Sequence, residues 1–279
     1  VIYITVANED DAYMIFETLN ARGKNLSSVD LVKNELFKQL RTTHPDDTAK
    51  RNWKKIQENL SNRNEKINIE TFFRHYWLSK YNFVTESKIY KNFKIASNKA
   101  DFQPINFLTD LKSESETYNK IANPLDSDWP SQDDKYILSS LKALSLFNIS
   151  QIRTFLLALI LKRKERKVKH ADFSEFLEKM EKFHFQYTAI CSLKMNIFEG
   201  KYSKTARDLR KVSNSNEAKN VLDQLSAFYQ AKQPDESLFK ESFKKLKFSR
   251  RFNKDKKLIQ YIFKKIENYL RPTDEIITG

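Results

Sequence analysis

Glycine, proline and cysteine are scarce in this sequence. Its 279 residues include three glycines, six prolines and one cysteine. A loop that holds phosphate groups through backbone amides needs clustered glycines, so three scattered ones exclude such a nucleotide loop. A single cysteine excludes an intrachain disulfide and suits a reducing cytosol. Because glycine and proline interrupt helices, their scarcity predicts that long helices dominate the fold.

The sequence also lacks a long apolar run. The longest, Phe155–Leu161, has seven residues, whereas a membrane-spanning helix needs roughly 20. The apolar start at Val1–Val6 is far too short for a secretory signal. A composition of 40% hydrophobic and 13% aromatic residues is ample for a packed core. We therefore predict a folded cytoplasmic protein without membrane contact.

Clustered metal-ligating residues are missing as well. The four histidines, His44, His75, His170 and His184, lie far apart, and no pair has the His-x-x-x-His spacing of a zinc site. Glu181 and His184 form one Glu-x-x-His motif, but a di-metal bundle site needs two such motifs and further carboxylates. We attribute this spacing to chance on a charged helix. The sequence thus predicts no metal site and no complete catalytic site within this chain.

What the sequence does contain is positive charge. The formal net charge is +14, which favours a polyanionic partner such as DNA. Most of the excess is lysine, and lysine reads base edges less well than arginine, whose planar fork bonds guanine with two hydrogen bonds. The charge therefore predicts contact with phosphate groups more strongly than recognition of a base sequence.

Apolar residues recur at helical spacing along most of the chain. The pattern predicts an all-α fold of about ten to twelve helices, preceded by one β-strand at Val1–Val6 that has no partner in the sequence. Aromatic residues crowd the predicted helix at Ile69–Tyr81. They could stack nucleic-acid bases if exposed, but we expect them to form a core stripe. Ile152–Lys164 is apolar nearly all round and is expected to be central. Asp172–Met195 is predicted to be one long amphipathic helix.

Turn-forming residues suggest where the chain divides. The clearest loop is Asn123–Asp134, which contains two prolines and several aspartates. We predict three parts. Residues 1–40 form the end of an N-terminal domain, residues 41–130 a helical subdomain, and residues 131–279 a second helical subdomain.

A corner between two helices is the most informative local pattern. Asp11–Leu19 has one apolar helical face, and Gly23 follows where a helix end needs left-handed backbone. Ser27 is then expected to cap the next helix, because its hydroxyl can accept from free amides of the first turn. Asp30, three residues later, completes an approximate capping box. These signals agree on a helix, a tight reversal and a second helix.

The same stretch resembles a known family. Phe-Glu-x-Leu-Asn-x-Arg-Gly-x-x-Leu-x-x-x-Asp-Leu-x-Lys-Asn, at residues 16–34, is similar to a signature near the end of the N-terminal domain of GmrSD-type, modification-dependent restriction endonucleases. The basic stretch Arg250–Glu267 resembles the helix that leads into that family's HNH domain. The resemblance implies an anti-phage, bacterial enzyme with a ParB-like N-terminal domain and a C-terminal HNH nuclease domain.

The resemblance also indicates which parts of such an enzyme are missing here. Neither an Asp-Gly-Gln-Gln-Arg motif, typical of the ParB-like domain, nor a His-x-x-Pro HNH start occurs in the sequence. We therefore interpret the chain as the helical region that couples the two domains. It would hold no cofactor itself, whereas the full-length protein would use an NTP and a divalent metal. Its expected partners are the two flanking domains and, through the full-length protein, DNA, and an oligomer is compatible with this interpretation.

Two groups of residues are candidates for contact with phosphate. At the corner, Asn20, Arg22 and Lys24 would project from a rigid turn toward a bound nucleotide or DNA. The alternative is purely structural: Asn20 and Gly23 cap the helix and Arg22 pairs with an acid such as Asp30.

The second group lies in the most basic segment. Residues 240–267 contain eleven lysines and arginines against three acids. The DNA-contact candidates in it are Lys247, Arg250, Arg251, Lys254, Lys256 and Lys257. The alternative is a solvated face of a helix without a ligand.

Two other functions fit the same composition. One is a free-standing, lysine-rich helical module that binds nucleic acid without catalysis. The other is a structural scaffold for a partner protein, which predicts no salt-dependent retention on DNA.

Overall fold

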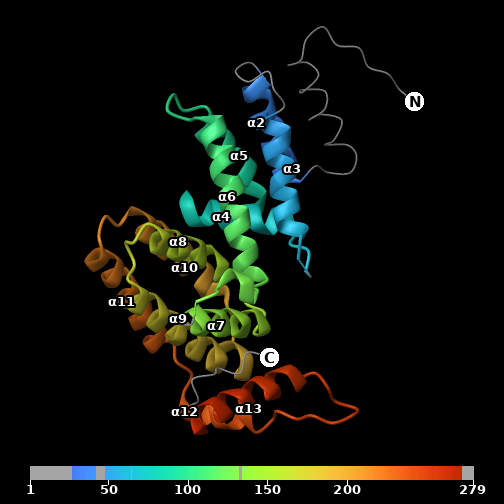
Figure 1. Cartoon of the computed structure of the whole chain (residues 1–279), viewed down its shortest axis with the longest axis vertical. Coiled ribbons are helices and arrows are strands. Elements are labelled where there is room, and N and C mark those ends of the chain that lie inside the picture. Colours follow the sequence, from blue (N-terminus) through green and yellow to red (C-terminus); the bar gives the residue numbers. More distant parts are fainter. Residues whose placement is uncertain (1–26, 42–47, 64, 132–133, 272–279) are drawn as a thin grey trace.

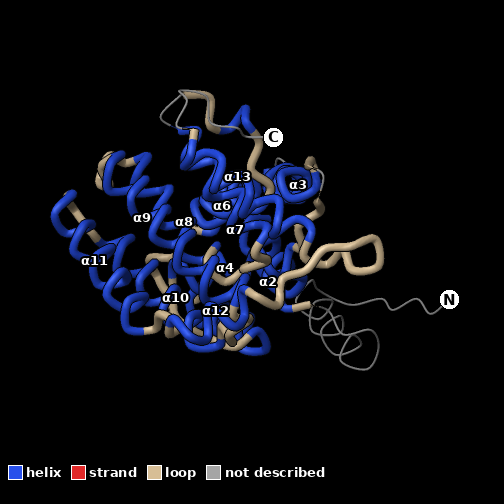
Figure 2. The backbone as a smooth tube through the Cα atoms, turned by 90° about the horizontal axis from the view of Figure 1, so that it is seen from below, coloured by secondary structure: helices blue, strands red, loops and turns tan. Residues whose placement is uncertain are grey.

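The computed structural model describes residues 27–41, 48–63, 65–131 and 134–271, and these ranges contain helices but no strand. This confirms the predicted all-α class (Figures 1 and 2). The predicted strand at Val1–Val6 lies outside the described residues. The twelve α-helices described are α2 (Ser28–Arg41), α3 (Thr48–Ser61), α4 (Ile69–Lys80), α5 (Ile89–Ser97), α6 (Pro104–Ala122), α7 (Lys135–Leu146), α8 (Arg153–Lys164), α9 (His170–His184), α10 (Asn196–Lys211), α11 (Ser215–Ala231), α12 (Glu236–Phe243) and α13 (Lys256–Leu270).

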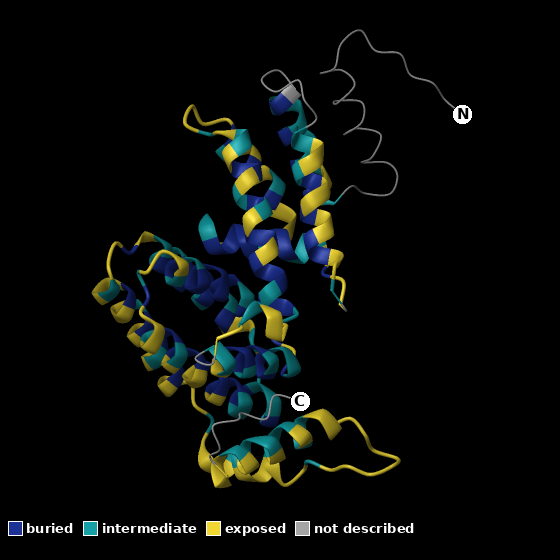
Figure 3. Cartoon of the chain, in the orientation of Figure 1, coloured by how far each residue is buried: buried dark blue, intermediate teal, exposed yellow. Residues whose placement is uncertain are grey.

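The helices form two stacked groups with a smaller pair at one end. Helices α2 to α6 make up one group and α7 to α11 the other, while α12 and α13 lie beyond α7 and α9 (Figure 1). The groups are joined because α8 and α10 pack against α4, and α8 also packs against α6. Burial is densest along this junction and lowest in α12 and α13 (Figure 3).

Helix α4 is the aromatic centre of the first group. Asn68 caps it by accepting a hydrogen bond from the Thr71 amide at 2.8 Å. Phe72, Phe73 and Trp77 are at most 1% exposed. The aromatic face therefore packs into the core, as predicted, and is not a surface for stacking bases.

Helix α8 holds the corresponding position in the second group. All residues from Thr154 to Ile160 are buried, and the helix packs against α4, α6, α9 and α10. A helix that is apolar nearly all round needs neighbours on every side, and α8 has them. Its predicted central place is confirmed.

The predicted single helix at Asp172–Met195 is wrong. Helix α9 ends at His184 and continues as a π-helical turn, Phe185–Ile190 (η4), before α10 begins at Asn196. The wider turn lets Phe185 face Tyr261 of α13, with ring centroids 5.6 Å apart, while Phe183 faces Tyr229 of α11 at 4.4 Å. The helix thus gives up regular α-helical hydrogen bonding at this turn, where it has aromatic contacts on opposite sides.

Left-handed backbone in the described residues is occupied by residues other than glycine. Asn148, Arg166 and Ser192 have φ angles of 56°, 59° and 52°. Asn148 and Arg166 follow the ends of α7 and α8, the positions where glycine is usual. Because the chain has only three glycines, Asn148 and Arg166 adopt this backbone instead, at a conformational free-energy cost of roughly 1–2 kcal/mol each.

Candidate nucleic-acid interface

The most basic segment forms a hairpin-like loop between α12 and α13. Asp235 caps α12 by accepting from the Leu238 amide at 2.8 Å. Beyond α12 the chain reverses through an isolated bridge between Ser249 and Phe252, whose backbone hydrogen bonds measure 2.9 and 3.1 Å. Arg250 and Arg251 form the tip of this reversal. We call residues 244–257 the basic hairpin; it projects away from the helical body (Figure 1).

The cations of the basic hairpin face solvent. All six DNA-contact candidates are exposed; they are Lys247, Arg250, Arg251, Lys254, Lys256 and Lys257. None of them forms an ion pair with an acid of the described residues. The nearest acid of the hairpin, Asp255, instead accepts the backbone amide of Lys247 at 3.3 Å. The structure thus gathers the six candidates into one unneutralised patch.

Two phenylalanines lie among these cations. Phe248 is 54% and Phe252 56% exposed, on either side of the arginine tip. Lys256 lies 5.9 Å from the centre of the Phe248 ring, and Lys247 lies 4.7 Å from that of Phe252. Exposed aromatic rings within a basic surface can stack nucleic-acid bases. These two rings were not among the predicted contact residues; the alternation of basic and aromatic residues in 244–252 was the available signal.

A buried carboxylate attaches α13 to the body. Glu181 of α9 is 2% exposed and accepts the hydroxyls of Ser140 at 2.7 Å and Tyr261 at 2.6 Å. Lys265 of α13 pairs with it at 2.6 Å. Burial, with the nearby Glu181 carboxylate, raises the pKa of Tyr261, so its hydroxyl remains a donor. Phe147 adds an edge-on contact with Tyr261 at 5.2 Å.

Replacing Glu181 should loosen α13 without affecting the core. In Glu181→Gln the carboxylate charge is lost, so Lys265 loses its partner. Backbone amides of α13 should then exchange hydrogen at least tenfold faster, which corresponds to a local opening free energy lower by about 1.4 kcal/mol. Hydrogen-exchange mass spectrometry measures this, with Glu178→Gln on the exposed side of α9 as control. Equal α13 protection in both variants would show that Glu181 does not hold the helix.

The Glu-x-x-His motif does not form a metal site. Glu181 turns toward α7 and α13, whereas His184 hydrogen bonds Tyr202 at 2.5 Å on the side of α10. Across the described ranges no three His, Cys, Asp or Glu side chains converge to hold a metal. In the same part of the chain no helix has the length and apolarity to cross a bilayer.

Of the corner, only the second half is described. Ser27 and Asp30 make reciprocal bonds at the start of α2: the Ser27 amide donates to the Asp30 carboxylate and the Asp30 amide to the Ser27 hydroxyl, both at 3.2 Å. Asp30 is thereby engaged as a cap. Asn20, Arg22, Gly23 and Lys24 lie outside the described residues, so their predicted roles stay predictions.

No family model, curated protein or solved structure matches this chain. The resemblance to GmrSD-type nucleases therefore stays a prediction from the sequence. Of its signature at 16–34, residues 27–34 are described. These eight residues contain the capping pair Ser27 and Asp30.

Proposed function

We propose that this chain is a DNA-binding helical region of a GmrSD-type restriction nuclease. In this proposal it couples a domain that senses a nucleotide or a DNA modification to an HNH domain that cuts DNA. The basic hairpin is the surface that holds the DNA. The observation that supports this most is the exposed set of six cations, none paired with an acid of the described residues.

The chemistry of the hairpin suits phosphate contact. Exposed lysines and arginines attract phosphate and release its counterions, which makes binding strongly salt-dependent. Arg250 and Arg251 at the tip can each hold a phosphate through two parallel hydrogen bonds. Phe248 and Phe252 could in addition stack bases where the strands are open.

The proposed coupling depends on the flanking domains. The sequence resemblance supports an NTP and a divalent metal in those domains, and a cytoplasmic location for the whole protein. Catalysis would then require the full-length polypeptide, either alone or as an oligomer. The rival is a free-standing binding module with the same hairpin. Coding sequence for Asp-Gly-Gln-Gln-Arg and HNH motifs in the same reading frame would favour the nuclease.

DNA binding by this chain should weaken when the hairpin tip loses its charges. In Arg250→Ala/Arg251→Ala we expect about tenfold lower affinity for duplex DNA at low salt, and a slope of log K against log salt that is smaller by about 1.8. Fluorescence anisotropy across a salt series measures both quantities.

The matched control removes two lysines from α3. Lys54 and Lys55 are 79% and 57% exposed and belong to α3, which lies far from the hairpin (Figure 1). Lys54→Ala/Lys55→Ala should therefore change the salt slope little. If both pairs reduce the slope equally, binding is a diffuse effect of net charge, and the proposed role of the hairpin is wrong.

A further inference from the structure

The tip of the basic hairpin is a narrow ribbon of two chain segments. Ser249 and Phe252 make both backbone hydrogen bonds of an antiparallel pair, at 2.9 and 3.1 Å, so Arg250 and Arg251 are the two loop residues. The Phe252 amide also lies 3.2 Å from the Ser249 hydroxyl, to which it donates. Every residue from Lys247 to Lys254 is exposed. The described helices therefore leave both sides of this ribbon open.

Backbone pairing separates the two phenylalanines of the hairpin. Partners in an antiparallel pair share a face, and neighbouring residues of an extended segment alternate between faces. Phe252 is therefore expected on the face of Ser249, and Phe248 on the other face. The lysine contacts agree with this, because Phe252 has Lys247 at 4.7 Å whereas Phe248 has Lys256 at 5.9 Å. Each ring thus has an ammonium group of its own beside it.

Neither phenylalanine stabilises the packing of the described helices. Leu258 and Tyr261 of α13 pack against the hydrophobic core, whereas Phe248 and Phe252 have no place in that core or beside it in the described part of the chain. Both are more than half exposed, at 54% and 56%. Aromatic side chains contribute most to stability when they are buried. Two exposed rings among cations are instead typical of a surface on which bases stack.

We propose that the basic hairpin binds DNA preferentially where bases are unpaired, with Phe248 and Phe252 each stacking on a base of the opened site. This inference rests on the proposed function and specifies the kind of DNA that the hairpin prefers. A base would stack on the open side of each ring, while the ammonium group beside the ring meets a phosphate of the same strand. Arg250 and Arg251, between the two rings, would bond further phosphates.

Unpaired bases favour this mode of binding for an energetic reason. Taking a base out of an intact duplex costs free energy, and the cost is smallest where the base is mismatched. An aromatic ring then restores stacking that the unpaired base has lost. The preference for open DNA should therefore come from the rings, whereas the salt dependence of binding comes from the cations.

The test compares two DNA probes that carry the same number of phosphates. One is an intact duplex, and the other is the same duplex with a central block of mismatches. Fluorescence anisotropy measures the affinity of the whole chain for each probe. We expect the wild-type chain to bind the mismatched duplex at least tenfold more tightly, a difference of about 1.4 kcal/mol.

Two double variants of the hairpin test whether the rings cause this preference. Phe248→Ala/Phe252→Ala should abolish it, while the affinity for the intact duplex and its salt slope stay nearly unchanged, because all six cations remain. Phe248→Tyr/Phe252→Tyr keeps both rings and should retain the preference. A melting curve for each variant establishes that it is folded.

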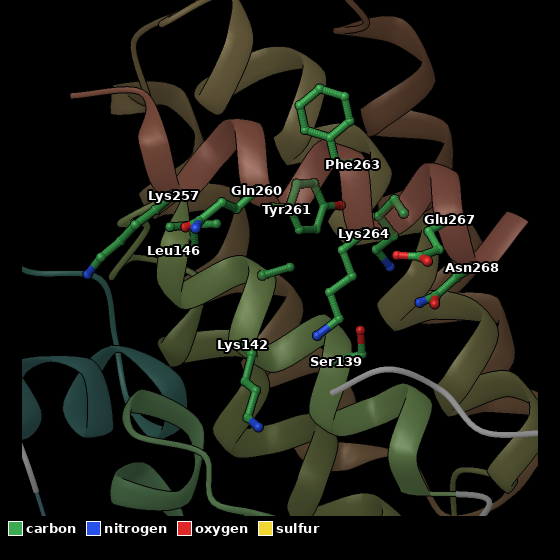
Figure 4. Close-up of a pocket in the computed structure, with 12 residues that line it drawn as sticks. Ser139, Lys142, Leu146, Lys257, Gln260, Tyr261, Phe263, Lys264, Glu267 and Asn268 are labelled. Carbon is green, nitrogen blue, oxygen red and sulfur yellow. The ribbon is translucent and has the colours of Figure 1, made fainter. Parts of the chain in front are cut away.

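The matched control is an exposed phenylalanine outside the hairpin. Phe263 of α13 is 66% exposed, and in Figure 4 its ring extends from α13 away from Ser139 and Lys142 of α7. Phe263→Ala removes a similar apolar surface from the same basic segment. The preference for the mismatched duplex should persist in this variant.

The outcomes distinguish this inference from the proposed function. Loss of the preference in Phe248→Ala/Phe252→Ala alone supports the stacking role. Equal wild-type affinity for both probes, with weaker binding in Arg250→Ala/Arg251→Ala, would support DNA binding by the hairpin and overturn the role of the rings. A preference that survives without the rings, or that Phe263→Ala also removes, would overturn that role as well. If the wild-type chain binds neither probe, both proposals are wrong.

Discussion

Replacing Arg210 by methionine is expected to destabilise the chain by about 3–5 kcal/mol, because it leaves a buried carboxylate without its partner. Arg210 of α10 bonds Glu114 of α6 at 2.9 Å, and the two side chains are 10% and 6% exposed. Arg210 also donates to the Ser79 hydroxyl at 3.0 Å. The pair thus joins α4, α6 and α10 where the two helical groups meet.

Burial already disfavours the charge on this carboxylate. Desolvation raises the pKa of Glu114, and Arg210 counteracts this. One carboxylate oxygen, Oε2, has no hydrogen-bond partner among the described residues. Without the guanidinium, Glu114 must either remain charged in an apolar surrounding or take up a proton, and both cost free energy.

A double variant distinguishes the loss of a partner from the loss of packing. Arg210→Met/Glu114→Leu removes both charges and should recover most of the stability, since buried pairs are often replaced by apolar groups at little cost. Urea unfolding measures all three free energies. Lys204→Ala, which breaks an exposed pair with Asp208, should cost about 1 kcal/mol or less. A loss in Arg210→Met no larger than that would contradict a role for the buried charge.

Acid is expected to destabilise the chain before its ordinary carboxylates titrate. Burial lowers the pKa of His75 to about 3, with smaller contributions from Arg153 and Arg74, and burial lowers the pKa of His184 to about 3. Both rings lie among hydroxyls: His75 contacts Tyr118 at 2.6 Å, and His184 contacts Tyr202. Both are therefore neutral in the folded chain at neutral pH.

The direction of the pH effect follows from these values. The unfolded chain binds a proton at each ring below the ordinary histidine pKa of 6.5, whereas the folded chain does so only near 3. Stability from these rings is thus complete above about pH 6.5 and falls as the pH decreases toward 3. At pH 5 the loss is about 2 kcal/mol for each ring.

Urea unfolding at pH 7 and at pH 5 measures this loss. Replacing His184 by glutamine, a neutral hydrogen-bonding residue, should lower stability at pH 7 and remove about half of the difference between the two pH values. Equal stability of the wild-type chain at pH 7 and pH 5 would exclude buried neutral rings.

Local patterns predicted the helices well. The cap formed by Ser27 and Asp30 has the bonds that their spacing predicted, and the aromatic helix α4 and the apolar helix α8 are buried as expected. Capping and apolar periodicity depend on residues three or four apart, so they can be read from sequence. The DNA-contact candidates could be grouped for the same reason, since they are neighbours in the chain.

Contacts between distant residues could not be predicted in this way. Glu181 bonds Ser140 and Tyr261, which lie 41 and 80 residues away. Ser140 of α7 and Tyr261 of α13 share this carboxylate only because α13 packs beside α7. Nothing in the spacing of either segment identifies the other, so these features require the tertiary arrangement.

The π-helical turn at Phe185–Ile190 has a consequence for how this chain can vary. The amide of Cys191 bonds the carbonyl of Gln186 five residues back, so the turn holds one residue more than an α-helical turn does. Deleting a residue there would let α9 continue as a regular helix. The chain after the turn, from α10 onward, would then rotate by about 100° around the axis of α9 relative to the helices before it. Insertions and deletions should thus be tolerated in the surrounding loops and excluded from this turn.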